Sequence, residues 1–212
     1  MLGIILGTGP GMFSDLGRAL CLAPRARIIA VNGAGVLYRD RIALWVSIHG
    51  DHLEAFIDER ERLGYPDGYA AWGNFGSRHQ NRRAHRWDKP NGGGSSALLA
   101  LEVSREVAGY THWILCGVPL SGHECKAWAN ADGEIMGQQD ASKRQTDRRE
   151  AEVLDSREPS RGGYLIYRKG WKQQRRQLAP FVRSMSGWTL ETFGAPTHEW
   201  VDRADSSCGG SA

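Results

Sequence analysis

Short apolar runs recur along the chain and predict the strands of a buried sheet. Residues 2–6 read LGIIL and residues 26–32 read ARIIAVN, so side chains on both faces of each strand are apolar. Strands of this kind are typical of parallel sheets that helices cover on both sides. Further runs occupy residues 42–48, 68–73, 111–120 and 181–185. We therefore predict an open, mostly parallel sheet of about five or six strands.

Segments with helical periodicity alternate with these runs. Residues 12–22 follow the first run, residues 52–63 follow the third, and residues 97–108 begin after Ser95 or Ser96, either of which supplies an N-cap. Shorter helices are expected within residues 33–38, 170–178 and 187–196. The alternation of strands and helices predicts an α/β fold of the Rossmann-like class.

The length of 212 residues suits a single domain with a sizeable core. Two stretches interrupt the alternation. Residues 74–94 are polar, basic and rich in glycine, and residues 121–162 are polar, with one charged helix expected around 139–154. We expect one domain over residues 1–200, with these stretches as lid or insertion segments, and a flexible tail over residues 201–212.

The charge balance is close to neutral, because 27 Lys and Arg face 24 Asp and Glu, for a net charge of +3. Basic residues nevertheless gather in 78–89, 143–149 and 168–176, where they form either a solvated face or a contact with phosphates. The four cysteines lack metal-binding spacing, and no apolar run approaches about 18 residues. We expect a cytoplasmic protein with no membrane partner.

The turn after the first predicted strand, Gly-Thr-Gly-Pro-Gly at residues 7–11, is similar to a phosphate-binding turn. Gly7 and Gly9 allow a ligand to approach the backbone, and the helix start offers N–H groups to an anion. The dinucleotide fingerprint, however, has glycine where this chain has Met12, and an acid where Asn32 ends the second strand. NAD binding is therefore disfavoured, and a purely structural tight turn stays open.

A second turn of this type precedes the 97–108 helix, where residues 91–96 read NGGGSS. Its glycines remove side-chain bulk, and its serines add hydroxyls directly before a helix start. No lysine follows the glycines, so the segment is not a P-loop. A flexible linker with an ordinary N-cap is the other interpretation. Ligands of parallel sheets bind beyond the carboxyl ends of the strands, where both turns are expected.

Four motifs occur in a fixed order: IILGTGPGM, IIAVNGAG, NGGGSSALLALEVSREVAGYTHWILCGVPL, and VRSMSG followed by TLETFGAP. Together they resemble the bacterial sialyltransferase-like superfamily. That group includes the motility-accessory-factor glycosyltransferases and the related archaeal-type hydroxymethylpterin diphosphokinases. The resemblance spans most of residues 2–120 and 180–196, and it implies a Rossmann-like, nucleotide-binding transferase domain.

The resemblance also implies a nucleotide site in two halves, one after the first strand and one before the 97–108 helix. Its residues would be Gly7, Thr8, Gly9, Pro10, Asn32, Gly33, Gly93, Gly94, Ser95 and Ser96. Three positions depart from the family pattern. Gly11 stands in place of a serine, Pro119 stands in place of an aspartate, and residues 164–171 lack the catalytic histidine of the sialyltransferases.

Glycosyl transfer needs a base that deprotonates the acceptor hydroxyl, and histidine titrates in the required range. His123 follows a predicted strand end and is the candidate replacement for the missing histidine. His49 follows an earlier strand and is the second candidate. Asp51 is the third candidate: in a diphosphokinase it would bind Mg²⁺, and its structural role would be to cap the helix that follows.

The departing phosphate must also be stabilised, which Lys, Arg or Tyr can do without a metal. The candidates are Arg82, Arg86, Tyr167, Arg168, Lys169 and Arg183. Arg82 and Arg86 belong to the predicted lid.

Three hypotheses about function remain open. The leading one is a glycosyltransferase that takes a nucleotide sugar and needs no further cofactor. The second is an ATP- and Mg²⁺-dependent diphosphokinase of the hydroxymethylpterin type. The third is a nucleotide- or nucleic-acid-binding module, or a transferase that modifies a nucleic-acid base, for which the basic stretches would contact phosphates. Dependence on divalent metal separates the first two.

Overall fold

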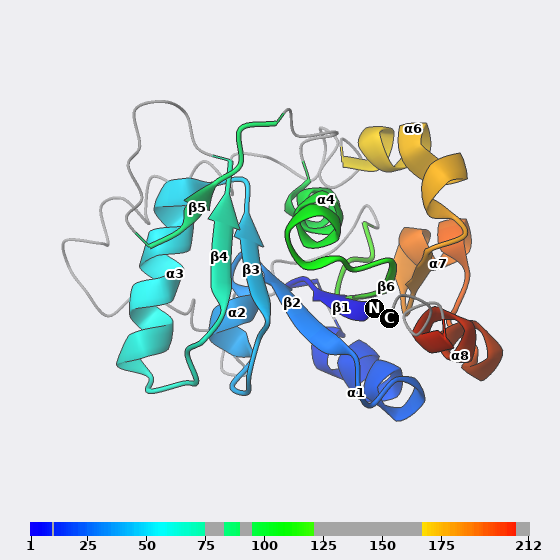
Figure 1. The fold of residues 1–212 in the computed structure, drawn as a ribbon, viewed down its shortest axis with the longest axis horizontal. Coiled ribbons are helices and arrows are strands. Elements are labelled where there is room, and N and C mark those ends of the chain that lie inside the picture. The colour runs from blue at the N-terminus through cyan, green and yellow to red at the C-terminus, as the bar shows by residue number, and fades with distance from the viewer. Residues whose placement is uncertain (10, 75–82, 90–94, 121–166, 207–212) are drawn as a thin grey trace.

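The described chain forms a seven-stranded sheet in which all neighbouring strands are parallel (Figure 1). The structure, a computed structural model, describes residues 1–9, 11–74, 83–89, 95–120 and 167–206. The strands are β1 (Leu2–Leu6), β2 (Arg27–Val31), β3 (Leu44–Ser47), β4 (Ala70–Gly73), β5 (His85–Arg86), β6 (His112–Cys116) and β7 (Val182–Ser184). The predicted α/β, Rossmann-like fold is confirmed, with more strands than expected.

Helices cover both faces of this sheet. They are α1 (Met12–Leu22), α2 (Ala34–Leu37), α3 (Gly50–Arg62), α4 (Ser96–Ala108), α6 (Arg168–Leu178), α7 (Gly187–Phe193) and α8 (His198–Ser206). Ile4 and Leu6 of β1 join a core with α1, α3 and α8, whereas Ile5 between them joins a second core with α4 and α6. Burial on both faces explains why the strands read as continuous apolar runs. None of the described helices is long and apolar enough to cross a membrane.

The order of strands reverses once across the sheet, which runs β5-β4-β3-β2-β1-β6-β7. From β1 the chain adds β2, β3, β4 and β5 in one direction across the sheet. It then returns through α4 and adds β6 on the other side of β1. Leu6 pairs with both Ala30 and Cys116, so the turns after β1, β2 and β6 leave the same edge of the sheet. Ligands of open parallel sheets bind at such an edge, where the strand order reverses.

Two parts of the chain differ from the predicted organisation. Within the 74–94 stretch, expected to lack regular structure, β5 pairs with β4 and Trp87 is buried beside it. The flexible tail predicted from residue 201 is wrong for residues 201–206, which continue α8 and bury Val201 and Ala204 in the core. The charged helix expected around 139–154, and the rest of the 121–162 stretch, lie outside the described residues.

Candidate functional site

The turn after β1 packs directly against the turn after β6. The amide of Gly7 donates to the carbonyl oxygen of Cys116 at 2.9 Å, and that of Gly9 donates to Gly117 at 2.8 Å. A Cβ atom on Gly9 would lie 2.5 Å from Cδ of Pro119. The close approach that requires these glycines is therefore an approach to the β6 turn. The amide hydrogens of Gly7 and Gly9 both donate to the β6 turn and are therefore not available to a ligand. The ligand contact predicted for the 7–11 turn would have to use other atoms.

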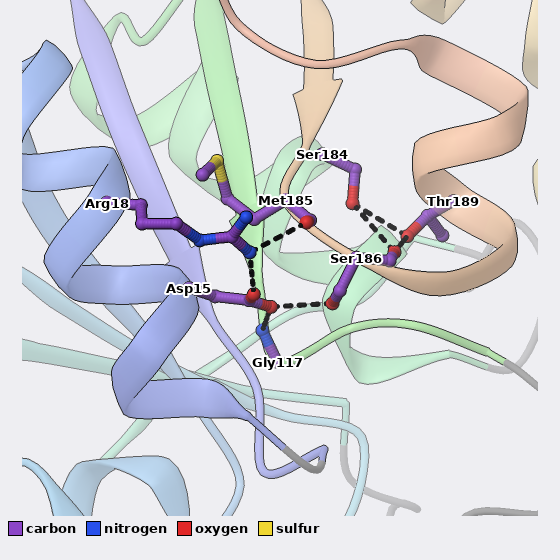
Figure 2. A network of polar contacts seen from close by, with 7 residues as sticks. All are labelled: Asp15, Arg18, Gly117, Ser184, Met185, Ser186 and Thr189. Atoms are coloured by element: carbon purple, nitrogen blue, oxygen red, sulfur yellow. Dashed lines mark hydrogen bonds and ion pairs between the residues drawn. The ribbon is translucent and has the colours of Figure 1, made fainter.

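Asp15, on α1, ties the turn after β6 to the C-terminal part of the chain (Figure 2). Its side chain is buried, and Oδ2 accepts from the amide of Gly117 at 3.0 Å and from Oγ of Ser186 at 2.6 Å. Oδ1 pairs with Arg18 at 2.8 Å, and the same guanidinium donates to the carbonyl oxygen of Met185 at 3.1 Å. One carboxylate thus joins α1, the β6 turn and the connection from β7 to α7.

The start of α7 completes this assembly (Figure 2). Oγ1 of the buried Thr189 lies 2.8 Å from Oγ of Ser184 and 2.7 Å from the carbonyl oxygen of Val118. Gly187 has a φ of 63°, and a Cβ atom there would lie 2.4 Å from Cβ of Pro119. The β6 turn is therefore held between α1 and α7, so the point where the strand order reverses is rigid.

A cluster of polar side chains lies at the same edge, beyond β2 and β3. Asn32 follows β2 with a φ of 51°, a left-handed conformation that is rare for a residue other than glycine. Oγ of the buried Ser47 lies 2.9 Å from Oδ1 of Asn32 and accepts the amide hydrogen of His49 at 3.0 Å. Asn32, Ser47 and the entry to α3 are thereby fixed relative to one another.

The side-chain nitrogen of Asn32 has no hydrogen-bond partner in the described part of the chain. The side chain is half-buried, and its Oδ1 is engaged by Ser47, so Nδ2 presents two donors at the carboxyl edge. Nε1 of Trp45 donates to the Asn32 carbonyl at 2.7 Å and holds the unusual backbone in place. Left-handed conformations of this kind concentrate at functional sites. Gly33, which follows, is the N-cap of α2.

The first turn of α4 lies beside this cluster. Oγ of Ser96 accepts the amide hydrogen of Ile48 at 3.2 Å, which joins the start of α4 to the end of β3. Ser95 is the N-cap, as predicted, but its side chain makes no capping hydrogen bond within the described residues. Uncapped amides in a first helical turn are donors that suit an anion. Gly93 and Gly94 lie outside the described residues, as does Pro10.

His49 is the predicted base that the structure brings to this edge. It is the N-cap of α3, and its ring lies 5.0 Å from the ring of His52, measured between centroids. Because α3 begins at Gly50, Asp51 lies inside the first turn, and the N-cap role predicted for it is wrong. The side chain of Asp51 and all of His123 lie outside the described residues.

The residues predicted to stabilise a phosphate are not all brought together. Arg183, on β7, donates to two backbone carbonyls at 2.7 Å each and lies 5.1 Å from the ring of Trp200. Burial lowers the pKa of this guanidinium. Arg86, on β5, is paired with Asp88 at 2.5 Å. These two arginines belong to opposite edge strands, so a phosphate site shared by them is ruled out. Arg82 lies outside the described residues.

Arg168 and Lys169, at the start of α6, are the described members of that set beside the β6 turn. Nε of Arg168 donates to the carbonyl oxygen of Leu120 at 2.6 Å, and its guanidinium lies 5.0 Å from the ring of Trp188. Tyr167 is the N-cap of α6 and packs half-buried against the core. The basic start of α6 therefore adjoins the reversal point of the sheet.

Asp15 and Ser47 are central to this edge and were not predicted from the sequence. Asp15 stands beside Ser14 among ordinary polar positions of an amphipathic helix, and Ser47 is a polar residue inside the apolar run 42–48. The signal that could have found them was weak: Asp15 lies in the first turns after the glycine-rich segment 7–11, and Ser47 lies near the end of its predicted strand. Among the described residues, no group of three or more His, Cys, Asp or Glu side chains is arranged to hold a metal ion.

Comparisons of the chain with protein-family models, with curated proteins and with solved structures find no match.

Proposed function

We propose that this protein is a transferase that binds a nucleotide-activated donor, most simply a nucleotide sugar, at the carboxyl edge of the sheet beside Asn32. One observation carries the proposal. Asn32 has a left-handed backbone, and Ser47 engages its Oδ1, which leaves the two hydrogens of Nδ2 for a ligand. An amide at this position suits a hydroxyl or carbonyl oxygen of a nucleotide. Open parallel sheets bind their ligands at this edge, which supports the assignment.

Neighbouring groups supply the other requirements of group transfer. The bond between the sugar's anomeric carbon and the phosphate oxygen breaks with its electron pair on that oxygen, and the acceptor oxygen bonds to the same carbon. The imidazole of His49 takes the proton of the acceptor hydroxyl. The uncapped first turn of α4 stabilises the negative charge on the departing nucleoside phosphate.

Thermal unfolding with CMP, UDP, GDP, ADP, ATP or NAD tests nucleotide binding. We expect a nucleotide other than NAD to stabilise the fold, by about 2.7 kcal/mol at about 100 times its Kd. Asn32→Gly is the decisive variant, because glycine accepts a φ of 51° and only the side chain is removed. It should fold and bind the nucleotide about tenfold more weakly or worse, which is about 1.4 kcal/mol.

Arg62→Gln is the matched control, since Arg62 is exposed and lies at the far end of α3. It should leave nucleotide affinity unchanged. If no nucleotide shifts the melting temperature, or if Asn32→Gly binds as tightly as the natural chain, the proposal fails.

The diphosphokinase is the second candidate, because Asp51 lies in the first turn of α3, just beyond β3. Turnover of a nucleotide sugar in excess chelator would support the glycosyltransferase. Transfer of diphosphate from ATP to a pterin alcohol, abolished by chelator, would replace it with the diphosphokinase.

A further inference from the structure

We infer that the exposed face of α6, with the adjoining face of α7, binds the phosphodiester backbone of a single-stranded nucleic acid. The inference goes beyond the proposed nucleotide site and does not depend on it. It rests on three properties of this surface: positive charge, two open depressions and an aromatic ring.

The charge on α6 is uniformly positive. Its 11 residues include five cations and no acid: Arg168, Lys169, Lys172, Arg175 and Arg176. Helical spacing puts residues 168, 172 and 175 along one stripe. Trp171 and Leu178, on the neighbouring face, are buried in the core. Lys169, Lys172, Arg175 and Arg176 are exposed, together with the uncharged Gln173 and Gln177. The side of the helix that faces solvent is therefore basic and carries no acid.

Within the described ranges these cations have no acidic partner, unlike those of the segment 83–89. Arg83 is paired with Asp58 at 2.6 Å and with Glu61 at 3.1 Å, and Lys89 is paired with Glu106. In the described part of the chain, no carboxylate forms an ion pair with any of the five cations of α6. Residues 83–89 are therefore neutralised locally, whereas no carboxylate of the described chain neutralises α6.

Two shallow, open depressions adjoin this stripe. One hollow of about 450 Å³ is lined by Arg168, Lys169, Lys172 and Gln173. The next, of about 420 Å³, is lined by Lys172, Arg175, Trp188, Glu191 and Thr192. Because both include Lys172, they lie side by side with a cation between them. Adjacent hollows of this kind suit consecutive nucleotides, with phosphates against the cations and a base against an aromatic ring.

The half-buried Trp188 favours a nucleic acid over an anionic membrane. A helix that lies on a membrane inserts an apolar face, and the apolar face of α6 is already buried in the core. Trp188 instead packs partly against the core and lines the second hollow, and the guanidinium of Arg168 lies 5.0 Å from its ring. An indole beside a guanidinium offers an aromatic and a cationic surface in one place, which suits the bases and phosphates of a single strand.

Fluorescence anisotropy with short, labelled single-stranded RNA and DNA of mixed sequence tests the inference over about 50 to 200 mM salt. We expect binding that weakens with salt. The double variant K172Q/R175Q should bind about tenfold more weakly and should lower the salt slope by about 1.4, which is the loss of two phosphate contacts to a single strand. W188L should weaken binding at all salt concentrations, and E191Q should strengthen it by removing the acid that lines the second hollow.

R83Q/K89Q is the matched control, because it removes the same charge from paired positions. It should change affinity less than about threefold. Circular dichroism and melting temperature establish that all variants are folded. The inference is overturned if the natural chain binds neither strand at low salt, or if R83Q/K89Q loses as much affinity as K172Q/R175Q. It is also overturned if vesicles of phosphatidylserine bind the protein and the nucleic acids do not.

Nucleotide-induced stabilisation of K172Q/R175Q should match that of the natural chain, which keeps this test separate from that of the proposed function.

Discussion

Oγ of Ser186 donates a 2.6 Å hydrogen bond to Oδ2 of Asp15, which precedes it by 171 positions in the sequence. The same oxygen accepts the amide hydrogen of Gly117. Two donors from distant segments thus converge on one buried oxygen, and the turn at the reversal point of the sheet depends on that convergence.

Asp15→Asn should therefore lower the free energy of unfolding by about 2 kcal/mol or more. The asparagine keeps one acceptor oxygen but replaces the other with a donor, which leaves buried donors unpaired. The measurement is the midpoint of urea unfolding. Arg18→Gln is the control, because Arg18 is 59% exposed and an ion pair of this kind contributes about 0 to 1 kcal/mol. If both variants lost the same free energy of unfolding, the stabilisation would come from the ion pair with Arg18 and not from the buried hydrogen bonds of Asp15.

Replacing Arg60, even by lysine, should destabilise the fold. Its side chain is 1% exposed and donates to the carbonyl oxygens of Gly35, Tyr38, Asp40 and Pro66 at 2.6 to 3.1 Å. A lysine has three donors and no planar fork, so several buried carbonyls lose their partners. We expect Arg60→Lys to cost about 2 kcal/mol or more in urea unfolding. A loss below about 0.5 kcal/mol would contradict this account.

His112 should make the fold less stable in mild acid. Burial, the amino group of Met1 and Arg183 all lower the pKa of His112 below its usual value of 6.5. The folded state then binds fewer protons than the unfolded state, so this contribution is fully present above the unfolded pKa and is lost as the pH falls through it. His112→Gln should reduce the loss of melting temperature between about pH 7.5 and pH 5.5. If the variant loses as much melting temperature between these two pH values as the natural chain, groups other than His112 cause the acid sensitivity.

Glu102 should have the opposite pH dependence. Burial raises its pKa above 4.5, although a hydrogen bond from Gln174 partly offsets this effect. A carboxyl group with a raised pKa costs stability as the pH rises from its unfolded pKa through its folded pKa. Glu102→Gln should therefore be more stable than the natural chain at neutral pH, by up to about 1 kcal/mol because partial exposure screens the charge. The gain should vanish near about pH 4, and a gain that persists there would have another cause.

His49 and His52 should differ in their effect on turnover if the proposed transferase activity is correct. His49→Gln should lower kcat by about 100-fold, the scale of a lost general base, with little change in KM for the donor. His52→Gln keeps the neighbouring ring of His49 in place and should lower kcat much less. Measurement of kcat against pH separates the roles, because loss of the base removes the acidic limb of the profile. Equal effects of the two substitutions would assign proton transfer to another group.

The fold was predictable where the pattern of apolar residues is long enough to be recognised. The 12–22 helix was expected at the bounds of α1, because its apolar residues recur at helical spacing over 11 residues. The 2–6 strand was expected at the bounds of β1 from an uninterrupted apolar run. β5 has two residues and cannot show a period. α8 was missed because its apolar residues occupy one short stretch near the end of a polar segment.

The candidate site was predictable only in part. Strand ends identified Asn32 and His49, since the carboxyl ends of parallel strands share one edge, and the glycine-rich turn before a helix identified Ser96. The sequence could not specify what approaches Gly7 and Gly9, because their neighbour is the turn after β6, far along the chain. The basic stretches looked alike as sequence, and only the folded positions of Asp58, Glu61 and Glu106 distinguish the neutralised segment from α6.

The bonds of Asp15 also fix an order of events during synthesis. The pairing of β1 with β2, of β2 with β3 and of β3 with β4 uses neighbouring segments and becomes available as each strand leaves the ribosome. The bond from Ser186 cannot exist until that serine has been translated. A nascent chain that ends before Ser186 carries an Asp15 carboxylate whose last partner is missing. The hydrogen bonds of Asp15 that hold the β6 turn beside the connection from β7 to α7 are therefore completed later than the pairing of β1 to β4.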